Sequence, residues 1–130
     1  MTMSKIYVFD TDASNTDFHM NLGHIVEIGV AEVNLKNFAV TPVFASVVRQ
    51  KDPDPRAWIF SNSSLMTDLV RRGANLDTVC DCLCDILTGQ EVTSFNIPYD
   101  RSYILRDMRK LDNRILWGDA STTDLPTEIK

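Results

Sequence analysis

The chain has 130 residues, 44% of them hydrophobic, and a net charge of −5 at neutral pH. This length and composition suit one domain with a buried core over residues 1–130. The acidic balance disfavours a protein coated with positive charge for nonspecific duplex binding. No apolar run approaches the ~20 residues of a membrane-spanning helix. The N-terminal MTMSK also lacks the apolar stretch of a signal peptide, so we expect a cytoplasmic protein without a membrane partner.

The first third of the chain predicts an antiparallel β-meander. Strands are expected over about 5–11, 24–34 and 40–50, with a polar loop over 12–22. The Asn-Leu-Lys-Asn connection at 34–37 suits a hairpin between the second and third strands. The following segment, KDPDPR at 51–56, carries two prolines and is expected to form a loop.

Helices dominate the predictions for the middle of the chain. Ser61 or Ser63 can cap a helix that runs to about Arg72, and Gly73 can end it. A second helix is expected over 76–88, after Asn75 as its cap and before Gly89. Its apolar residues recur at three- and four-residue steps and form one stripe: Leu76, Val79, Cys80, Leu83, Ile86 and Leu87. Free structural thiols are the favoured interpretation of Cys80, Cys82 and Cys84.

A strand over 92–96 is expected to pair in parallel with the first strand after this helical crossover. A helix over about 99–111 should follow, and the tail from Trp117 is rich in turn-forming residues. Trp58 and Trp117 are assigned to packing. The basic side chains of the last helix are assigned to a solvated face. The inner face of that helix is predicted to consist of Ile104, Leu105, Met108 and Leu111.

Two aspartates follow the apolar run Ile6-Tyr7-Val8-Phe9 in the segment IYVFDTDAS. Strand side chains alternate with period two, so Asp10 and Asp12 project from the same side of the sheet. Two carboxylates held side by side favour a bound cation. The alternative is a turn in which the aspartates only hydrogen-bond the backbone.

A second polar segment, VTSFNIPYD at 92–100, places Asn96 and Asp100 where another β-rich run ends. Asp100 alone could be a helix N-terminal carboxylate stabilised by the macrodipole. In combination, DTD at 10–12, HIVEIGV at 24–30 and NIPYD at 96–100 resemble, in order, the motifs of the DEDD exonucleases. The resemblance implies an α/β fold of ribonuclease H type, in which a mixed sheet begins with a three-strand meander and continues with helices and a parallel strand.

The resemblance also implies roles for individual residues. Asp10, Asp12 and Asp100 are the expected catalytic and metal-binding residues for two Mg²⁺ or Mn²⁺ ions, with Asp10 contacting both ions and Asp12 holding the one that carries the nucleophilic water. Glu27 is expected beside this centre, and Asn96 is expected to orient its loop. The expected substrate contacts are Thr11, Phe18, His19, Met20 and Asn96. Phe18 and Met20 could equally form a hydrophobic lid on the core.

This sequence departs from the family pattern at two places. Asp12 stands where the family usually has Glu. The third motif, a His or Tyr followed by an Asp on a C-terminal helix, is not found, so the domain is expected to be shortened at its C-terminal side. Tyr103 and Asp107 have a similar spacing, interpreted as coincidence. A second copy of the chain could cover the shortened side, or supply Asp119 or Asp124 to the site.

The leading hypothesis is a metal-dependent 3′–5′ exonuclease that acts on single-stranded DNA or RNA 3′ ends. The alternative is a catalytically inactive ribonuclease H-like module that binds nucleic acid or a protein partner. A third possibility is an unrelated acidic α/β domain whose aspartates only form turns. Metal binding separates the third hypothesis from the other two, and turnover separates the first from the second.

Overall fold

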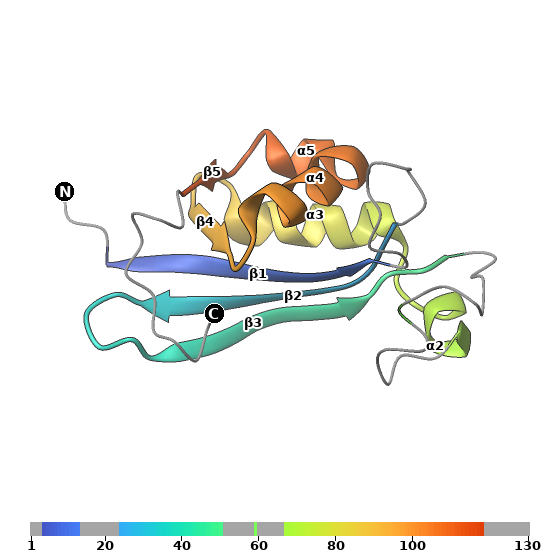
Figure 1. The fold of residues 1–130 in the computed structure, drawn as a ribbon, viewed down its shortest axis with the longest axis horizontal. Coiled ribbons are helices and arrows are strands. Elements are labelled where there is room, and N and C mark those ends of the chain that lie inside the picture. The colour runs from blue at the N-terminus through green and yellow to red at the C-terminus, as the bar shows by residue number, and fades with distance from the viewer. Residues whose placement is uncertain (1–3, 14–23, 51–58, 60–66, 119–130) are drawn as a thin grey trace.

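A five-stranded mixed sheet forms the centre of the computed structural model, which describes residues 4–13, 24–50, 59 and 67–118. The strand order is β3-β2-β1-β4-β5. Figure 1 shows α3, α4 and α5 together on one side of β1, with α2 apart from them beyond the end of β3. The strands are β1 (Lys5–Ala13), β2 (Ile25–Asn34), β3 (Val40–Val47), β4 (Glu91–Ser94) and β5 (Leu116–Trp117).

The predicted meander is confirmed, because β1 pairs antiparallel with β2 and β2 pairs antiparallel with β3. The hairpin between β2 and β3 is held by Asn34, whose Oδ1 accepts a hydrogen bond from the backbone N–H of Lys36 at 2.8 Å. Two boundaries differ from the sequence prediction. Strand β1 continues to Ala13, since Asp12 pairs with Glu27 and extends the ladder into the expected loop. Strand β3 stops at Val47, after which one isolated bridge to Ala74 replaces the ladder.

Strand β3 forms one edge of the sheet. Its ladder with β2 is irregular, because Val30 pairs with Phe44 while the next residue of β2, Ala31, pairs with Pro42. Val43 is therefore the extra residue of a β-bulge, a feature that bends a strand and increases its twist. This edge combines a bulge with a proline, which has no backbone N–H to donate.

The helices after β3 follow the predicted order. Helix α2 (Thr67–Arg71) ends just before Gly73, and helix α3 (Leu76–Leu87) begins at its predicted cap. The Asn75 side chain accepts a hydrogen bond from the Asp77 N–H at 2.8 Å. Gly89 follows α3 with a φ of 77°, a left-handed conformation that glycine adopts without steric cost and that turns the chain toward β4. The predicted thiols are free, with Cys80 and Cys84 buried and Cys82 exposed.

The C-terminal part of the described chain differs most from the sequence prediction. The expected strand over 92–96 is β4, which pairs in parallel with β1 as predicted. The single helix expected over 99–111 is divided into α4 (Ile97–Asp107) and α5 (Arg109–Asp112), because Met108 leaves the helical region with a φ of −136°. Leu105 is exposed rather than internal, and Tyr103 is buried in its place. Trp117, expected in the tail, lies in β5, which pairs in parallel with β4.

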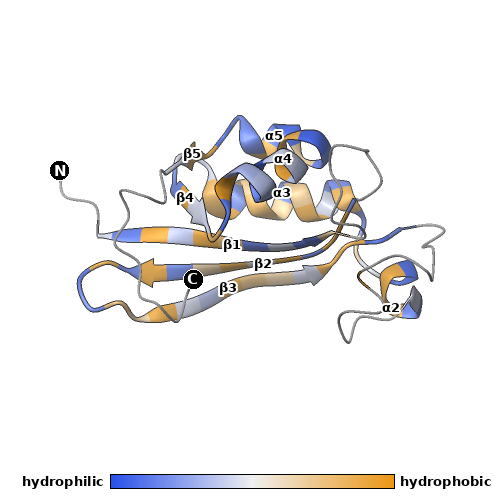
Figure 2. Cartoon of the chain, viewed as in Figure 1, coloured by the Kyte–Doolittle hydropathy of each residue, from blue (hydrophilic) through white to orange (hydrophobic). Residues whose placement is uncertain are grey.

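The main core lies between one face of the sheet and the three grouped helices. Tyr7 and Phe9 of β1 point into it, with buried apolar residues of α3 and α4. The residues between them, at even positions of β1, therefore point to the opposite face. Figure 2 shows hydrophilic residues gathered in the second half of β1, where that strand carries its two aspartates. Among the described residues no helix is both long and apolar enough to cross a membrane.

Candidate active site

Two aspartates project from the face of the sheet opposite α3 and α4. The register pairs Asp10 with Gly29 of β2, and Asp12 with Glu27. Directly opposed residues of an antiparallel pair share a face of the sheet, so Asp10, Asp12 and Glu27 lie together on it. Asp10 is exposed and Asp12 is half-buried. The predicted placement of both aspartates on one side of β1 is confirmed.

The third carboxylate lies beside the edge of β1. Strand β4 pairs with β1 only as far as Phe9, which lies opposite Ser94. Beyond Phe9, that edge of β1 has no strand partner within the described part of the chain. Helix α4 begins three residues after Ser94, with Asp100 in its first turn. The unpaired edge of β1 therefore separates Asp10 and Asp12 on one side from Asp100 on the other.

A buried hydrogen bond fixes Asp100 against this edge. The Thr11 hydroxyl, from the strand residue between the two aspartates, donates to Asp100 Oδ1. Both residues are only 6% exposed. The Ser94 hydroxyl also lies near the Asp100 carboxylate, although it makes no hydrogen bond of ordinary geometry. Thr11, predicted as a substrate contact, is thus engaged by Asp100.

Electrostatics agree with this placement of the carboxylates. Burial raises the pKa of Asp12 above its usual value, and the negative charges of Asp10, Glu27 and Asp100 raise it further. Burial is also the largest cause of the raised pKa of Asp100, opposed by the hydroxyls of Thr11 and Ser94. Like charges held near an acid disfavour its ionisation. Such a group gains stability when a cation neutralises part of its charge.

The chemistry of these side chains fits a hard divalent cation. Mg²⁺ and Mn²⁺ prefer carboxylate oxygens, and Asp10, Asp12 and Asp100 offer oxygen ligands alone. In the structure as described, no three His, Cys, Asp or Glu side chains lie close enough together to form a closed set of ligands. Ion binding at this site would therefore require the side chains to approach one another.

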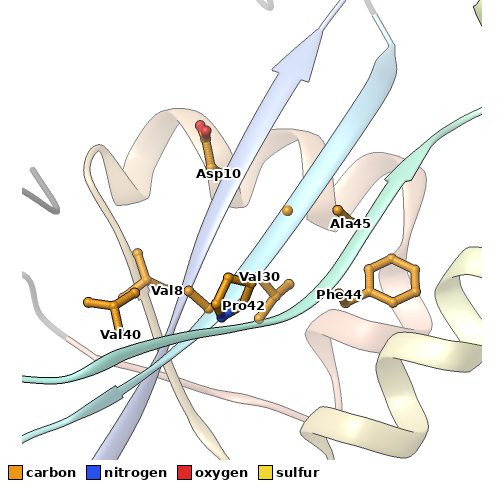
Figure 3. Close-up of a pocket in the computed structure, with 9 residues that line it drawn as sticks. Val8, Asp10, Val30, Val40, Pro42, Phe44 and Ala45 are labelled. Atoms are coloured by element: carbon orange, nitrogen blue, oxygen red, sulfur yellow. The ribbon is translucent and has the colours of Figure 1, made fainter.

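An apolar pocket adjoins Asp10 among residues of β1, β2 and β3. It has a volume of about 540 Å³. Figure 3 shows the Asp10 side chain on β1 pointing away from Val8, Val40 and Pro42, which line the same pocket. Val40 is 46% exposed, and the Gly29 backbone opposite Asp10 adds no side chain. The acidic group thus borders an accessible apolar surface.

The other predicted site residues are placed as follows. Asn96 is exposed and is the N-cap of α4, and its carbonyl oxygen accepts from the Asp100 N–H at 3.0 Å. Phe18, His19 and Met20 lie outside the described residues, as do Asp119 and Asp124. The sequence does not predict the hydrogen bond between Thr11 and Asp100. The one feature that could have indicated it is the position of Thr11 between two candidate ligands.

The fold is similar to that of solved exonuclease structures. Escherichia coli exonuclease I in complex with a dA16 oligonucleotide superimposes with a TM-score of 0.68 over 90% of this chain, at 13% identity. The complex of the same enzyme with a dT13 oligonucleotide gives a TM-score of 0.69 over 90% of this chain, at 14% identity. A product-bound structure of exonuclease I gives a TM-score of 0.70 over 91% of this chain, at 13% identity.

The matched region is a minority of each of these proteins. This chain covers 28% of the dA16 and dT13 complexes and 30% of the product-bound structure. No family model matches the chain, and no curated protein matches it in sequence. The resemblance predicted from the three motifs is therefore confirmed at the level of the fold.

Proposed function

We propose that this chain is a metal-dependent 3′–5′ exonuclease domain that hydrolyses phosphodiester bonds at the ends of single-stranded nucleic acid. The observation that carries the proposal is the grouping of Asp10, Asp12 and Asp100 around the unpaired edge of β1. This grouping occurs on a fold shared with exonuclease I. An apolar cluster would stabilise this fold better than mutually repelling acids, so the acids favour a functional explanation.

The carboxylates would act as ligands of Mg²⁺ or Mn²⁺. Asp10 and Asp12 would hold the ions from the strand, and Asp100 would hold them from the helix. Bound divalent ions supply an activated water and stabilisation of the leaving oxygen. Thr11 keeps Asp100 directed toward the edge of β1, because its hydroxyl donates to one carboxylate oxygen. Glu27, paired with Asp12, adds negative charge that favours cation binding.

Single-stranded nucleic acid is the substrate class that fits best. Two of the similar exonuclease I structures are complexes with dA16 and dT13 oligonucleotides. The net charge of −5 disfavours broad electrostatic binding to a duplex, whereas a short single strand requires only a local groove.

Cleavage of a labelled oligonucleotide tests the proposal. A 5′-labelled single strand, as DNA and as RNA, is incubated with the protein in Mn²⁺ or Mg²⁺. We expect a ladder that shortens from the 3′ end and disappears in Asp10→Ala. Asp85→Ala is the matched control, because Asp85 is an exposed aspartate of α3 outside the carboxylate group. Its ladder should match the wild type.

The absence of cleavage by folded wild-type protein would refute the exonuclease. If the same protein still bound the oligonucleotide, the inactive binding module would replace it. If the protein bound neither oligonucleotide nor Mn²⁺, the aspartates would have only a structural role.

A further inference from the structure

A second cleft lies where β4 turns into α4. It has a volume of about 430 Å³, and Phe95, Asn96, Arg101 and Trp117 are among the residues that line it. Phe95 is 71% exposed, the most exposed of the large hydrophobic residues in the described chain. An exposed aromatic ring gains nothing from the core, so its position in a cleft indicates a surface that binds a ligand.

Three contacts fix the Trp117 ring in this cleft. Its Nε1–H donates to Asp112 Oδ1 at 2.8 Å. The Phe9 ring lies against it, with the two centroids 5.8 Å apart. The Arg101 guanidinium carbon lies 5.7 Å from the Trp117 centroid. The aromatic wall is therefore rigid before any ligand arrives, which lowers the entropic cost of binding.

Arg101 brings positive charge to the same cleft. Its Nε donates to Asp112 Oδ1 at 3.3 Å, and its side chain is 49% exposed. Arginine has five N–H donors, and within the described chain only this one is hydrogen-bonded. The remaining donors can reach an anionic group of a ligand that rests against the aromatic rings.

The cleft lies next to the carboxylate group. Phe95 follows Ser94, which is paired with Phe9, the residue before Asp10. Phe95 therefore comes immediately after the last residue of β4 that pairs with β1, and Asp10 comes immediately after its partner on β1. Asn96, Arg101 and Asp100 belong to one segment, so the acidic group and the cleft share the start of α4.

We propose that this cleft binds one nucleotide of a single strand upstream of the terminal phosphodiester, with the base stacked on Phe95 and its phosphate contacted by Arg101. This inference rests on the proposed function. Base stacking on an aromatic side chain tolerates every base, and a neighbouring arginine recognises the phosphate geometrically. A purely apolar ligand would leave the exposed donors of Arg101 without a partner.

The test measures binding without cleavage. Asp10→Asn protein is titrated with a fluorescein-labelled eight-nucleotide thymidine strand in Mg²⁺, and anisotropy gives the affinity. We expect Phe95→Ala in this background to weaken binding roughly 5- to 100-fold, the usual range for one stacked base. Arg101→Gln should also weaken binding and should reduce its salt dependence. Leu69→Ala is the control, because Leu69 is a 45% exposed apolar residue on α2, away from the cleft.

Two further measurements distinguish binding in the Phe95 cleft from a disturbance of the carboxylate group. In the wild-type background, affinity for Mn²⁺ should be the same with and without Phe95→Ala, since Phe95 offers no ligand oxygen to the ion. In Trp58→Phe protein, where Trp117 is the single tryptophan, the strand should change its fluorescence.

Equal affinities of Phe95→Ala and Leu69→Ala for the strand would overturn the subsite. If wild-type protein cleaved the strand in that case, the proposed exonuclease would stand without it. If wild-type protein neither bound nor cleaved the strand, both proposals would fall together.

Discussion

The Thr11 hydroxyl is the residue-scale link between strand β1 and Asp100. It donates to a carboxylate that is almost entirely buried, and hydrogen bonds to charged groups contribute about 1.5–3 kcal/mol. We expect Thr11→Val to lower the free energy of unfolding by about 2 kcal/mol at neutral pH. Urea denaturation measures this change. Thr11→Ser, which keeps the hydroxyl, is the control, and equal stability of the two variants would contradict the prediction.

Asp12 is held in an environment that opposes its charge. Its pKa is raised by burial and by neighbouring carboxylates, so ionised Asp12 destabilises the folded state. We expect Asp12→Asn to raise the melting temperature at neutral pH in the presence of a chelator, whereas Asp85→Asn should not.

The stability that Asp12→Asn adds should depend on pH, because only ionised Asp12 destabilises the fold. Above the raised folded pKa the penalty of ionised Asp12 is fully present. As the pH falls through that pKa toward the unfolded value of 3.8, both states bind the proton and the penalty disappears. The advantage of Asp12→Asn should therefore shrink on acidification. An advantage that stayed constant down to pH 4 would show that charge is not its cause.

At the scale of elements, Asp107 joins the end of α4 to the start of β2. Its Oδ2 accepts from the Ile25 N–H at 3.0 Å, and its Oδ1 accepts from Arg106 Nε at 2.9 Å. His24 Nδ1 lies 3.4 Å from the same carboxylate. Asp107 thus has a structural role, which accounts for the Tyr103 and Asp107 spacing without a third catalytic motif.

We expect Asp107→Ala to destabilise the fold by about 2 kcal/mol, because a buried backbone donor and a charged partner lose their acceptor. Asp81→Ala is the matched control. Asp81 pairs with Lys110 at 2.8 Å, but both side chains are more than half exposed, so its loss should cost much less than the loss of Asp107. Chemical denaturation gives the free energy of unfolding of both variants. Similar decreases in the two variants would contradict the structural role of Asp107.

The sequence predicts elements best where one pattern determines them. The apolar run before Asp10 predicts β1, and the apolar stripe with its cap at Asn75 predicts α3, since both patterns are local. The break at Met108 and strand β5 were missed. Strand β5 has two residues and exists because it pairs with β4, a contact that no local pattern contains. The length of β1 was underestimated, because the pairing of Asp12 with Glu27 supports it from another strand.

At the scale of the whole molecule, ion binding should be linked to folding. A cation that binds the grouped carboxylates only in the folded state stabilises it by about 2.7 kcal/mol at 100 times its Kd. We expect Mn²⁺ to raise the melting temperature of the wild type and to have a smaller effect on Asp10→Asn. Asp85→Asn should respond as the wild type does. Equal shifts in all three proteins would place the ion elsewhere.

The candidate residues come from local motifs, whereas their arrangement depends on contacts between distant segments. Asp10, Asp12 and Asp100 follow from ordered motifs, and the structure places them around one strand edge. The early end of β4, beyond which that edge has no strand partner among the described residues, and the orienting role of Thr11 depend on register between distant segments. The exposure of Phe95 likewise emerges only once α4 and β5 are in place.

The outer strand β3 bears on how the protein behaves at high concentration. A long regular edge strand offers its free backbone groups to other molecules and promotes edge-to-edge aggregation. In β3, Pro42 lacks an N–H group, and the bulge at Val43 interrupts the pleat. Within the described chain, these two features make β3 a poor template for sheet growth along that edge.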